Sequence, residues 1–181
     1  MKKLAIILVT FLSFYNLSAQ KYMTRNGYIG FFSHTPMEDI KADNNQVASV
    51  LDTGTGEIVF QVLMKSFKFE KSLMEEHFNE NYVESEKFPK STFSGEIGEP
   101  SSLDLTVNGK YEVVVEGDLT IHGITKKVSA PGIIEVKNES IVATAKFVIV
   151  PEDYGIEIPG VVREKIAKEL EVSVEMKYTR M

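Results

Sequence analysis

Apolar and polar residues alternate with a period of two along most of the chain. In residues 111–122 the apolar side chains fall on one face, and Val114 is the one apolar residue on the other. Residues 170–179 repeat this alternation, and residues 141–150 carry a similar apolar face. This pattern is typical of β-strands with one buried and one solvated face. The chain is therefore predicted to consist mainly of strands.

Five earlier or intervening segments have the same character. These expected strands cover residues 28–34, 46–51, 57–64, 92–97 and 126–136. Turns rich in glycine and asparagine, such as 53–56 and 108–109, separate strands from one another. Eight strands with short connections predict an all-β fold, in which an antiparallel sheet closes into a barrel and so loses its free edges.

Two segments have helical character and add one or two short helices to the predicted barrel. Residues 72–79 place Leu73, His77 and Phe78 within a turn of one another, and Ser72 is a candidate N-cap. Residues 162–168 could form a second short helix.

The N-terminus has the pattern of a secretory signal peptide. Lys2 and Lys3 precede an apolar run over residues 4–12, and a plausible cleavage site follows Ala19. The run is shorter than the roughly 20 residues that span a bilayer, so no stable membrane insertion is expected. We therefore expect a signal peptide at 1–19 and one mature domain at 20–181, exported to the periplasm.

Charge and cysteine content narrow the choice of partners. The chain has 20 basic and 26 acidic residues, and loss of Lys2 and Lys3 leaves a mature net charge of -8. No basic cluster interrupts this excess, which argues against nucleic acid and anionic membranes as partners. Without cysteine, the chain has no disulfide, no lipid attachment through cysteine and no thiol nucleophile.

Several motifs suggest catalysis but are incomplete. Asp52-Thr53-Gly54 resembles the active-site loop of aspartic proteases, yet those enzymes need two such aspartates and this chain has one copy. A glycine-rich hairpin turn is the simpler interpretation. The chain also lacks a Gly-x-Ser-x-Gly elbow and a glycine-rich loop before a helix, so neither a serine hydrolase nor nucleotide binding is supported.

The three histidines show no metal-binding spacing. His77 lies among glutamates but belongs to no His-Glu-x-x-His motif, and His34 is expected to end a strand. His122 precedes Gly123 on the polar face of its strand, where it is expected to stabilise the turn rather than act in catalysis. No metal or cofactor is expected.

The barrel interior has two interpretations that alternation alone leaves open. Eight strands enclose a space that is either filled by side chains or holds one small ligand. Small inward residues (Gly95, Gly117, Ala143 and Ala145) would leave room inside the barrel. Glycine in a strand can equally mark a bend.

Six segments, in this order and spacing, resemble the YceI family of small secreted barrels. They are residues 56–60, 65–67, 76–78, 86–93, 117–126 and 153–156. The family is similar to lipocalins, and the resemblance implies an elongated barrel that holds a polyisoprenoid, a fatty acid or amide, or a similar long chain. The residues expected to line the ligand site are Phe60, Val62, Phe78, Phe93, Val115, Leu119, Ile121, Ala145, Phe147, Val172, Val174 and Met176.

Two further expectations concern the surface. Family members often carry arginine two positions before the aspartate of the Asp-Tyr-Gly-Ile turn, but here that position is Pro151, followed by Glu152. The more negative local charge disfavours an anionic head group there. On the outer face, Val142, Val148 and Val150 form a patch that could pair two copies into a homodimer.

Three functional hypotheses follow. The first is a non-catalytic periplasmic protein that binds, stores or transports a long-chain lipid or isoprenoid. The second is an enzyme that acts on a lipid-like substrate through His122 or His77 with a nearby carboxylate. The third is a filled barrel that serves as a structural or interaction module.

Overall fold

The computed structural model describes residues 21–98, 103–105, 107–138 and 140–181. The predicted signal peptide, residues 1–19, lies outside the described residues. The described strands are β1 (Lys21–His34), β2 (Asp39–Asp52), β3 (Glu57–Leu63), β4 (Lys68–Phe69), β5 (Lys90–Ile97), β6 (Gly109–Ile121), β7 (Ile124–Lys137), β8 (Ser140–Ile149) and β9 (Leu170–Arg180).

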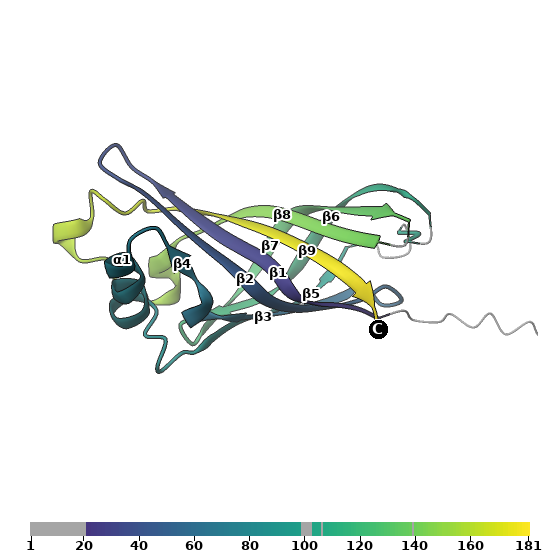
Figure 1. Ribbon diagram of the computed structural model, residues 1–181, viewed down its shortest axis with the longest axis horizontal. Helices are drawn as coiled ribbons and strands as arrows, with labels where there is room; N and C mark the ends of the chain where they lie inside the picture. Colours follow the sequence, from purple (N-terminus) through teal and green to yellow (C-terminus); the bar gives the residue numbers. More distant parts are fainter. Residues whose placement is uncertain (1–20, 99–102, 106, 139) are drawn as a thin grey trace, which may run out of the picture.

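Eight of these strands close into an antiparallel barrel, which confirms the predicted fold. The sheet runs in the order β1-β9-β8-β7-β6-β5-β3-β2, and pairing of β1 with β2 closes it. The two-residue strand β4 pairs with β2 through Ala42 and Asp43, outside this ring. The barrel is elongated, and the chain's C-terminus lies at one end of the long axis (Figure 1).

The register places the predicted apolar faces inside the barrel. Ala143 pairs with Met176 and Phe147 pairs with Val172 across β8 and β9, and all four side chains belong to the inward face of these strands. Because side chains alternate between faces, the charged residues between them point to solvent.

Strands β1 and β2 extend further than the sequence pattern predicted. In β1 a register shift between Thr24 and Gly27 changes the phase of the alternation, so the start of the strand does not continue the pattern that follows it. In β2 the inward residue Asn44 is polar and fully buried, and its Nδ2 donates to the carbonyl oxygen of Leu63 at 2.9 Å. Because an inward position holds a polar side chain, the apolar alternation is interrupted there, and the sequence pattern does not indicate the full length of β2.

The helical predictions are partly wrong. Helix α1 (Ser72–His77) forms as expected and continues as a π-helical turn, η2 (Phe78–Tyr82). However, its N-cap is Lys71, and no side chain caps the helix. Residues 162–168 form no α-helix, and the 3-10 turn η5 (Gly160–Val162) includes only the first of them. In that segment the backbone N–H of Ala167 donates to Ser33 Oγ in the barrel, so a tertiary contact takes the donor that a helix would have used.

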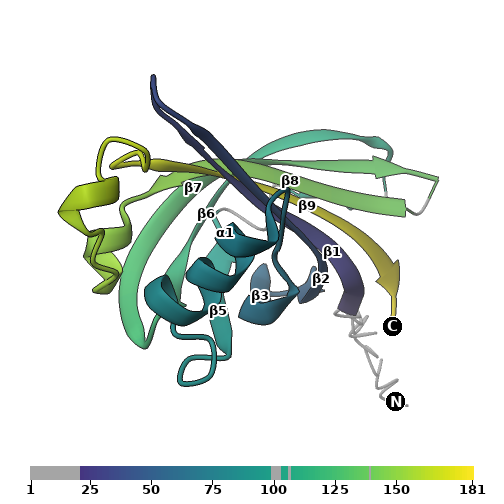
Figure 2. The ribbon, with the colours of Figure 1, turned by 60° about the vertical axis from the view of Figure 1, so that its left-hand side comes forward.

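The two ends of the barrel differ. One end is capped by the tip of the β1–β2 hairpin, by α1 and by the segment between β8 and β9 (Figures 1 and 2). Toward the other end the interior is packed. A Cβ added to Gly27 would lie 2.1 Å from Met176 Sδ, and one added to Gly117 would lie 2.7 Å from the Phe93 ring. The room predicted from Gly95 and Gly117 is thus occupied by Phe93.

Candidate functional site

A cavity of about 480 Å³ lies in the capped end of the barrel. Its wall is formed by inward side chains of the barrel, including Ile29, Val62 and Leu119. Its roof is formed by residues from the hairpin tip, α1, η2 and the segment between β8 and β9. The lining is predominantly apolar, as expected for a site that binds a small organic ligand rather than an ion.

Four phenylalanines form one side of this cavity. Phe31 comes from β1, Phe67 and Phe69 flank the start of β4, and Phe78 begins η2. Their ring centroids lie 5.0 to 5.8 Å apart in tilted or edge-on pairs. Such geometries are favourable for aromatic pairs, so the cluster holds η2, and α1 before it, against the barrel. The same rings also line the cavity.

Polar groups are concentrated at the mouth. Lys71 Nζ lies 2.9 Å from Glu38 Oε1, and both residues line the cavity together with His77 and Lys165. The hydrogen bond from Lys71 lowers the pKa of Glu38, and the charge of Lys165 acts in the same direction. Inside the cavity, the buried hydroxyl of Ser91 donates to Met64 Sδ at 3.0 Å. The interior is therefore apolar, and the polar groups lie where a head group would sit.

A family model for the YceI-like domain matches residues 16–178 of this chain. The chain belongs to the YceI family. A comparison with curated proteins gives no match.

Solved structures of YceI-like and related proteins share the fold at low sequence identity. A polyisoprenoid-binding domain from Saccharophagus degradans, implicated in plant cell wall breakdown, is 14% identical with a TM-score of 0.78, over 90% of this chain and 99% of that one. BcnA of Burkholderia cenocepacia is 14% identical with a TM-score of 0.69, over 84% and 96%. The Campylobacter jejuni YceI protein is 13% identical with a TM-score of 0.63, over 82% and 88%.

The twelve predicted site residues of this YceI-family chain divide into three groups. Six line the cavity: Val62, Phe78, Leu119, Ile121, Phe147 and Val172. Four lie outside the lining: Phe60, Phe93, Val115 and Met176. The Phe60 and Phe93 rings pack edge-on at 5.8 Å, and Met176 is fully buried. Ala145 and Val174 also lie outside the lining and border a different hollow.

That second hollow lies across strands β6 to β9. Its volume is about 980 Å³, but Glu112, Lys146 and Glu175 line it beside Val114 and Ile133. These five residues belong to the outward face of their strands, so the hollow is open to solvent. It is larger than the barrel cavity, yet it would not shield an apolar chain from water.

Sequence reasoning missed most of the roof. Met64, Ile156, Ile158 and Ile166 line the cavity from segments outside the barrel strands. Their positions follow from how these segments fold back over the barrel end, which strand periodicity does not encode. The spacing Phe67-x-Phe69, close to the helix that carries Phe78, was the one local signal.

His122 lies beside the cavity and joins three segments. Its Nδ1 is 3.2 Å from the carbonyl oxygen of Tyr154, its Nε2 is 2.7 Å from Glu84 Oε2, and its ring packs edge-on against Phe88 at 4.5 Å. His122 and Glu84 both have a positive φ, of 51° and 44°. Since both ring nitrogens face protein partners, neither is free to act on a bound ligand. The arrangement gives His122 the turn-stabilising role that the sequence predicted.

Two other motifs have local structural roles. Asp52 Oδ1 accepts from the backbone N–H of Gly54 at 2.9 Å and of Thr55 at 3.3 Å, which fixes the turn between β2 and β3. Glu152, which follows Pro151, forms an ion pair with Arg163. The expected excess of negative charge at Glu152 is therefore offset by a cation from the next segment.

Within the described residues, no helix combines the length and apolar character needed to cross a membrane. No group of three or more histidine or acidic side chains in the same part of the chain is placed to hold a metal ion.

Proposed function

We propose that this protein binds one long-chain apolar ligand in the capped end of the barrel and carries it without chemical change. The observation that carries the proposal is the apolar cavity of about 480 Å³, lined by Val62, Leu119, Phe147 and Val172, with the charged residues Glu38, Lys71 and Lys165 also in its lining. A polyisoprenoid-binding domain among the structural neighbours supports the same ligand class.

The cavity volume limits the ligand. One water molecule takes about 30 Å³ of liquid volume, and a methylene group is of similar size. The cavity of about 480 Å³ therefore holds about 16 such groups, which is one chain of fatty-acid or farnesyl length. Burial of each methylene contributes about 0.8 kcal/mol, so apolar contact alone would supply most of the binding free energy.

We propose that the periplasm is the site of action. The charged start, the apolar run of residues 4–12 and the small residue Ala19 support export. The absence of cysteine from the whole sequence means that the fold needs no disulfide in an oxidising compartment. The protein would then store its ligand or move it through an aqueous space in which the free lipid is insoluble.

A reporter tryptophan tests this proposal, because the chain contains no tryptophan of its own. In Phe147→Trp the indole would line the cavity, whereas in Phe60→Trp it would lie outside the lining. Each variant is titrated with farnesol and with geranylgeraniol, and the indole emission is recorded. We expect a saturable change in Phe147→Trp and a much smaller one in Phe60→Trp.

An unchanged emission in both variants, with folding confirmed by circular dichroism, would count against ligand binding in this cavity. An emission change of equal size in both variants would show that the ligand extends along the whole barrel and is not confined to its capped end. Chemical alteration of the bound alcohol, seen by mass analysis after incubation, would instead favour the enzyme hypothesis.

A further inference from the structure

Three strongly exposed apolar side chains stand around the cavity mouth. They are Val161, Met37 and Leu73, with exposed fractions of 91%, 63% and 58%. Among the large apolar side chains of the described residues, Met181, Val148 and Val107 are exposed to a similar degree, at 68%, 56% and 54%, but each stands apart from the others. Such side chains gain nothing for folding where they stand, and a cluster of them marks a contact surface. We call Met37, Leu73 and Val161 the mouth rim.

The mouth rim is continuous with the cavity. Leu73 itself lines the cavity, Met37 precedes the lining residue Glu38, and Val161 precedes the lining residue Val162. The three residues come from the hairpin tip, from α1 and from η5, which all gather at the same end of the molecule (Figure 1). The rim therefore lies next to the cavity at the capped end of the barrel.

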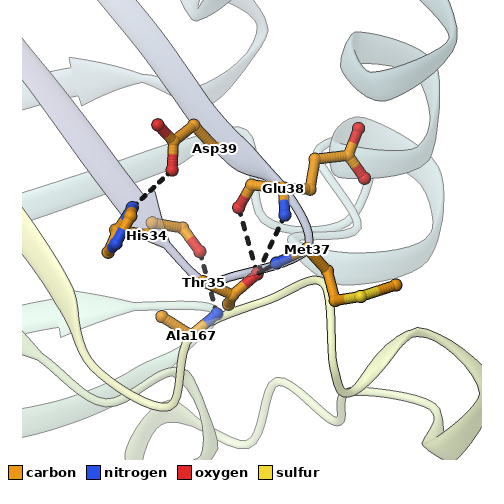
Figure 3. Close-up of polar contacts among 7 residues, drawn as sticks. His34, Thr35, Met37, Glu38, Asp39 and Ala167 are labelled. Atoms are coloured by element: carbon orange, nitrogen blue, oxygen red, sulfur yellow. Dashed lines mark hydrogen bonds and ion pairs between the residues drawn. The ribbon is translucent and has the colours of Figure 1, made fainter.

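The hairpin tip that carries Met37 is an ordered structure (Figure 3). Thr35 Oγ1 accepts from the backbone N–H of Met37 at 3.2 Å and of Glu38 at 3.1 Å, and it lies 3.1 Å from the carbonyl oxygen of Glu38. At the base of the tip, His34 Nδ1 lies 2.6 Å from Asp39 Oδ1. These contacts close the turn at Met37, whose side chain points to solvent.

Two contacts fix the three rim segments to one another. The backbone N–H of Ala167 donates to Ser33 Oγ at 2.9 Å, which ties the segment that carries Val161 to the hairpin. Lys71 Nζ lies 2.9 Å from Glu38 Oε1, which ties the start of α1 to the same hairpin. The rim is therefore one preorganised surface built on three segments.

We propose that the mouth rim docks onto the surface of a zwitterionic phospholipid bilayer, with Met37, Leu73 and Val161 inserted among the lipids so that the ligand passes between bilayer and cavity without crossing water. This docking deepens the proposed function and rests on it. The rim supplies too few apolar side chains for stable insertion, so the contact is peripheral and reversible.

Charge selects this partner over others. The three segments, residues 33–40, 70–77 and 157–169, carry eight carboxylates and four lysine or arginine side chains. An acidic surface is repelled by anionic lipids, whereas the ammonium groups of zwitterionic head groups can pair with it and the lysines can meet their phosphates. A second copy docked mouth to mouth would set like charges against each other.

The test is flotation of the full mature protein with phosphatidylcholine vesicles. The double variant Met37→Gln, Val161→Ser removes two rim side chains that do not line the cavity and adds no charge. Val107→Ser is the matched control, because Val107 is 54% exposed beside β6 at the opposite end of the barrel. We expect at least a tenfold loss of vesicle-bound protein in the double variant and no change in the control.

A second measurement separates this inference from the proposed function. The same rim substitutions, placed in the Phe147→Trp reporter, should leave farnesol uptake from dilute solution unchanged while slowing farnesol transfer out of vesicles. If the Phe147→Trp reporter takes up no farnesol but flotation still depends on the rim, the proposed ligand binding is refuted and the docking proposal stands.

Three results would overturn the docking proposal. The first is wild-type protein that fails to float with phosphatidylcholine vesicles, and the second is a double variant that floats as well as the wild type. The third is a concentration-dependent dimer that the rim substitutions abolish, which would show that a second copy covers the rim.

Discussion

Nε2 of His122 lies 2.7 Å from Oε2 of Glu84, and this contact links two turns that are 38 residues apart in the chain. The other ring nitrogen faces the carbonyl oxygen of Tyr154. The imidazole therefore lies between two acceptor oxygens that come from different segments. The cavity roof is thereby fixed to the barrel through one imidazole.

The first prediction concerns acid stability. The hydrogen bond from His122 lowers the pKa of Glu84, whose unfolded value is about 4.3. A carboxyl group with a lowered folded pKa stabilises the protein above its unfolded pKa, and this contribution is lost as pH falls through the folded value. We expect Glu84→Gln to flatten the decline in the free energy of unfolding below pH about 4.3, measured by urea titration.

The neighbouring Glu86 is a matched control for this prediction. Its carboxylate pairs with Lys65 at the surface and has no contact with His122. Glu86→Gln should leave the acid decline as in the wild type. Identical acid profiles for Glu84→Gln and the wild type would show that the contact with His122 has no weight in solution.

The second prediction concerns packing at the closed part of the barrel. A Cβ on Gly117 would lie 2.4 Å from the Ser94 carbonyl oxygen, whereas one on Gly160 would meet nothing within 4 Å. Overpacking of this kind costs about 1 to 3 kcal/mol. Gly117→Ala should therefore lower the free energy of unfolding by about that amount, and Gly160→Ala should change it by less than about 0.5 kcal/mol. Equal stabilities in a denaturant titration would contradict the packing of Phe93 over Gly117.

The third prediction compares two bulky substitutions inside the barrel. Val172 lines the cavity, so Val172→Trp should fill space that the ligand needs and weaken farnesol binding at least tenfold. Ala145 lies outside that lining and pairs with Gly132. Ala145→Phe should therefore reduce stability by about 1 to 3 kcal/mol through overpacking while uptake persists. Competition against wild-type protein for labelled farnesol measures ligand binding by both variants. Loss of binding in Ala145→Phe alone would show that the ligand site lies near Ala145 and not near Val172.

The fourth prediction concerns alkaline stability. Burial, reinforced by the hydrogen bond to Asp43 at 2.6 Å, raises the pKa of Tyr28 to about 12. A phenol with a raised folded pKa contributes stability that is complete below its unfolded pKa of about 10 and is lost as pH rises toward the folded value. Tyr28→Phe should flatten the fall in unfolding free energy between pH about 10 and about 12. Burial also raises the pKa of Tyr178, so part of the fall in unfolding free energy with pH should remain in Tyr28→Phe.

The sequence predicted the barrel well because strand alternation reports directly on which face is buried. The inward faces of β6, β8 and β9 lie where periodicity placed them. It failed where tertiary contacts override local preference. In residues 162–168, the backbone N–H of Ala167 donates to Ser33, and no helix forms despite the local sequence preference. In β2, the buried polar residue Asn44 interrupts the apolar alternation, so the predicted strand was too short.

The candidate site was harder to predict than the fold. Periodicity states that Met176 and Phe147 both face inward, but it does not state how far along the barrel the interior is filled. That depends on Met176 lying against Gly27 and Phe93 lying over Gly117, which are contacts between distant strands. The homodimer suggested by Val142, Val148 and Val150 stays a prediction, and of these three residues only Val148 is strongly exposed.

The most direct measurement is native mass spectrometry of the protein purified from its native host, followed by solvent extraction and mass analysis of the bound material. We expect one chain of about 16 methylene-sized groups bound in a one-to-one complex, and we expect Val172→Trp to emerge without it. A bare wild-type protein that also takes up neither farnesol nor geranylgeraniol would contradict a ligand-carrying function and would direct attention to protein partners.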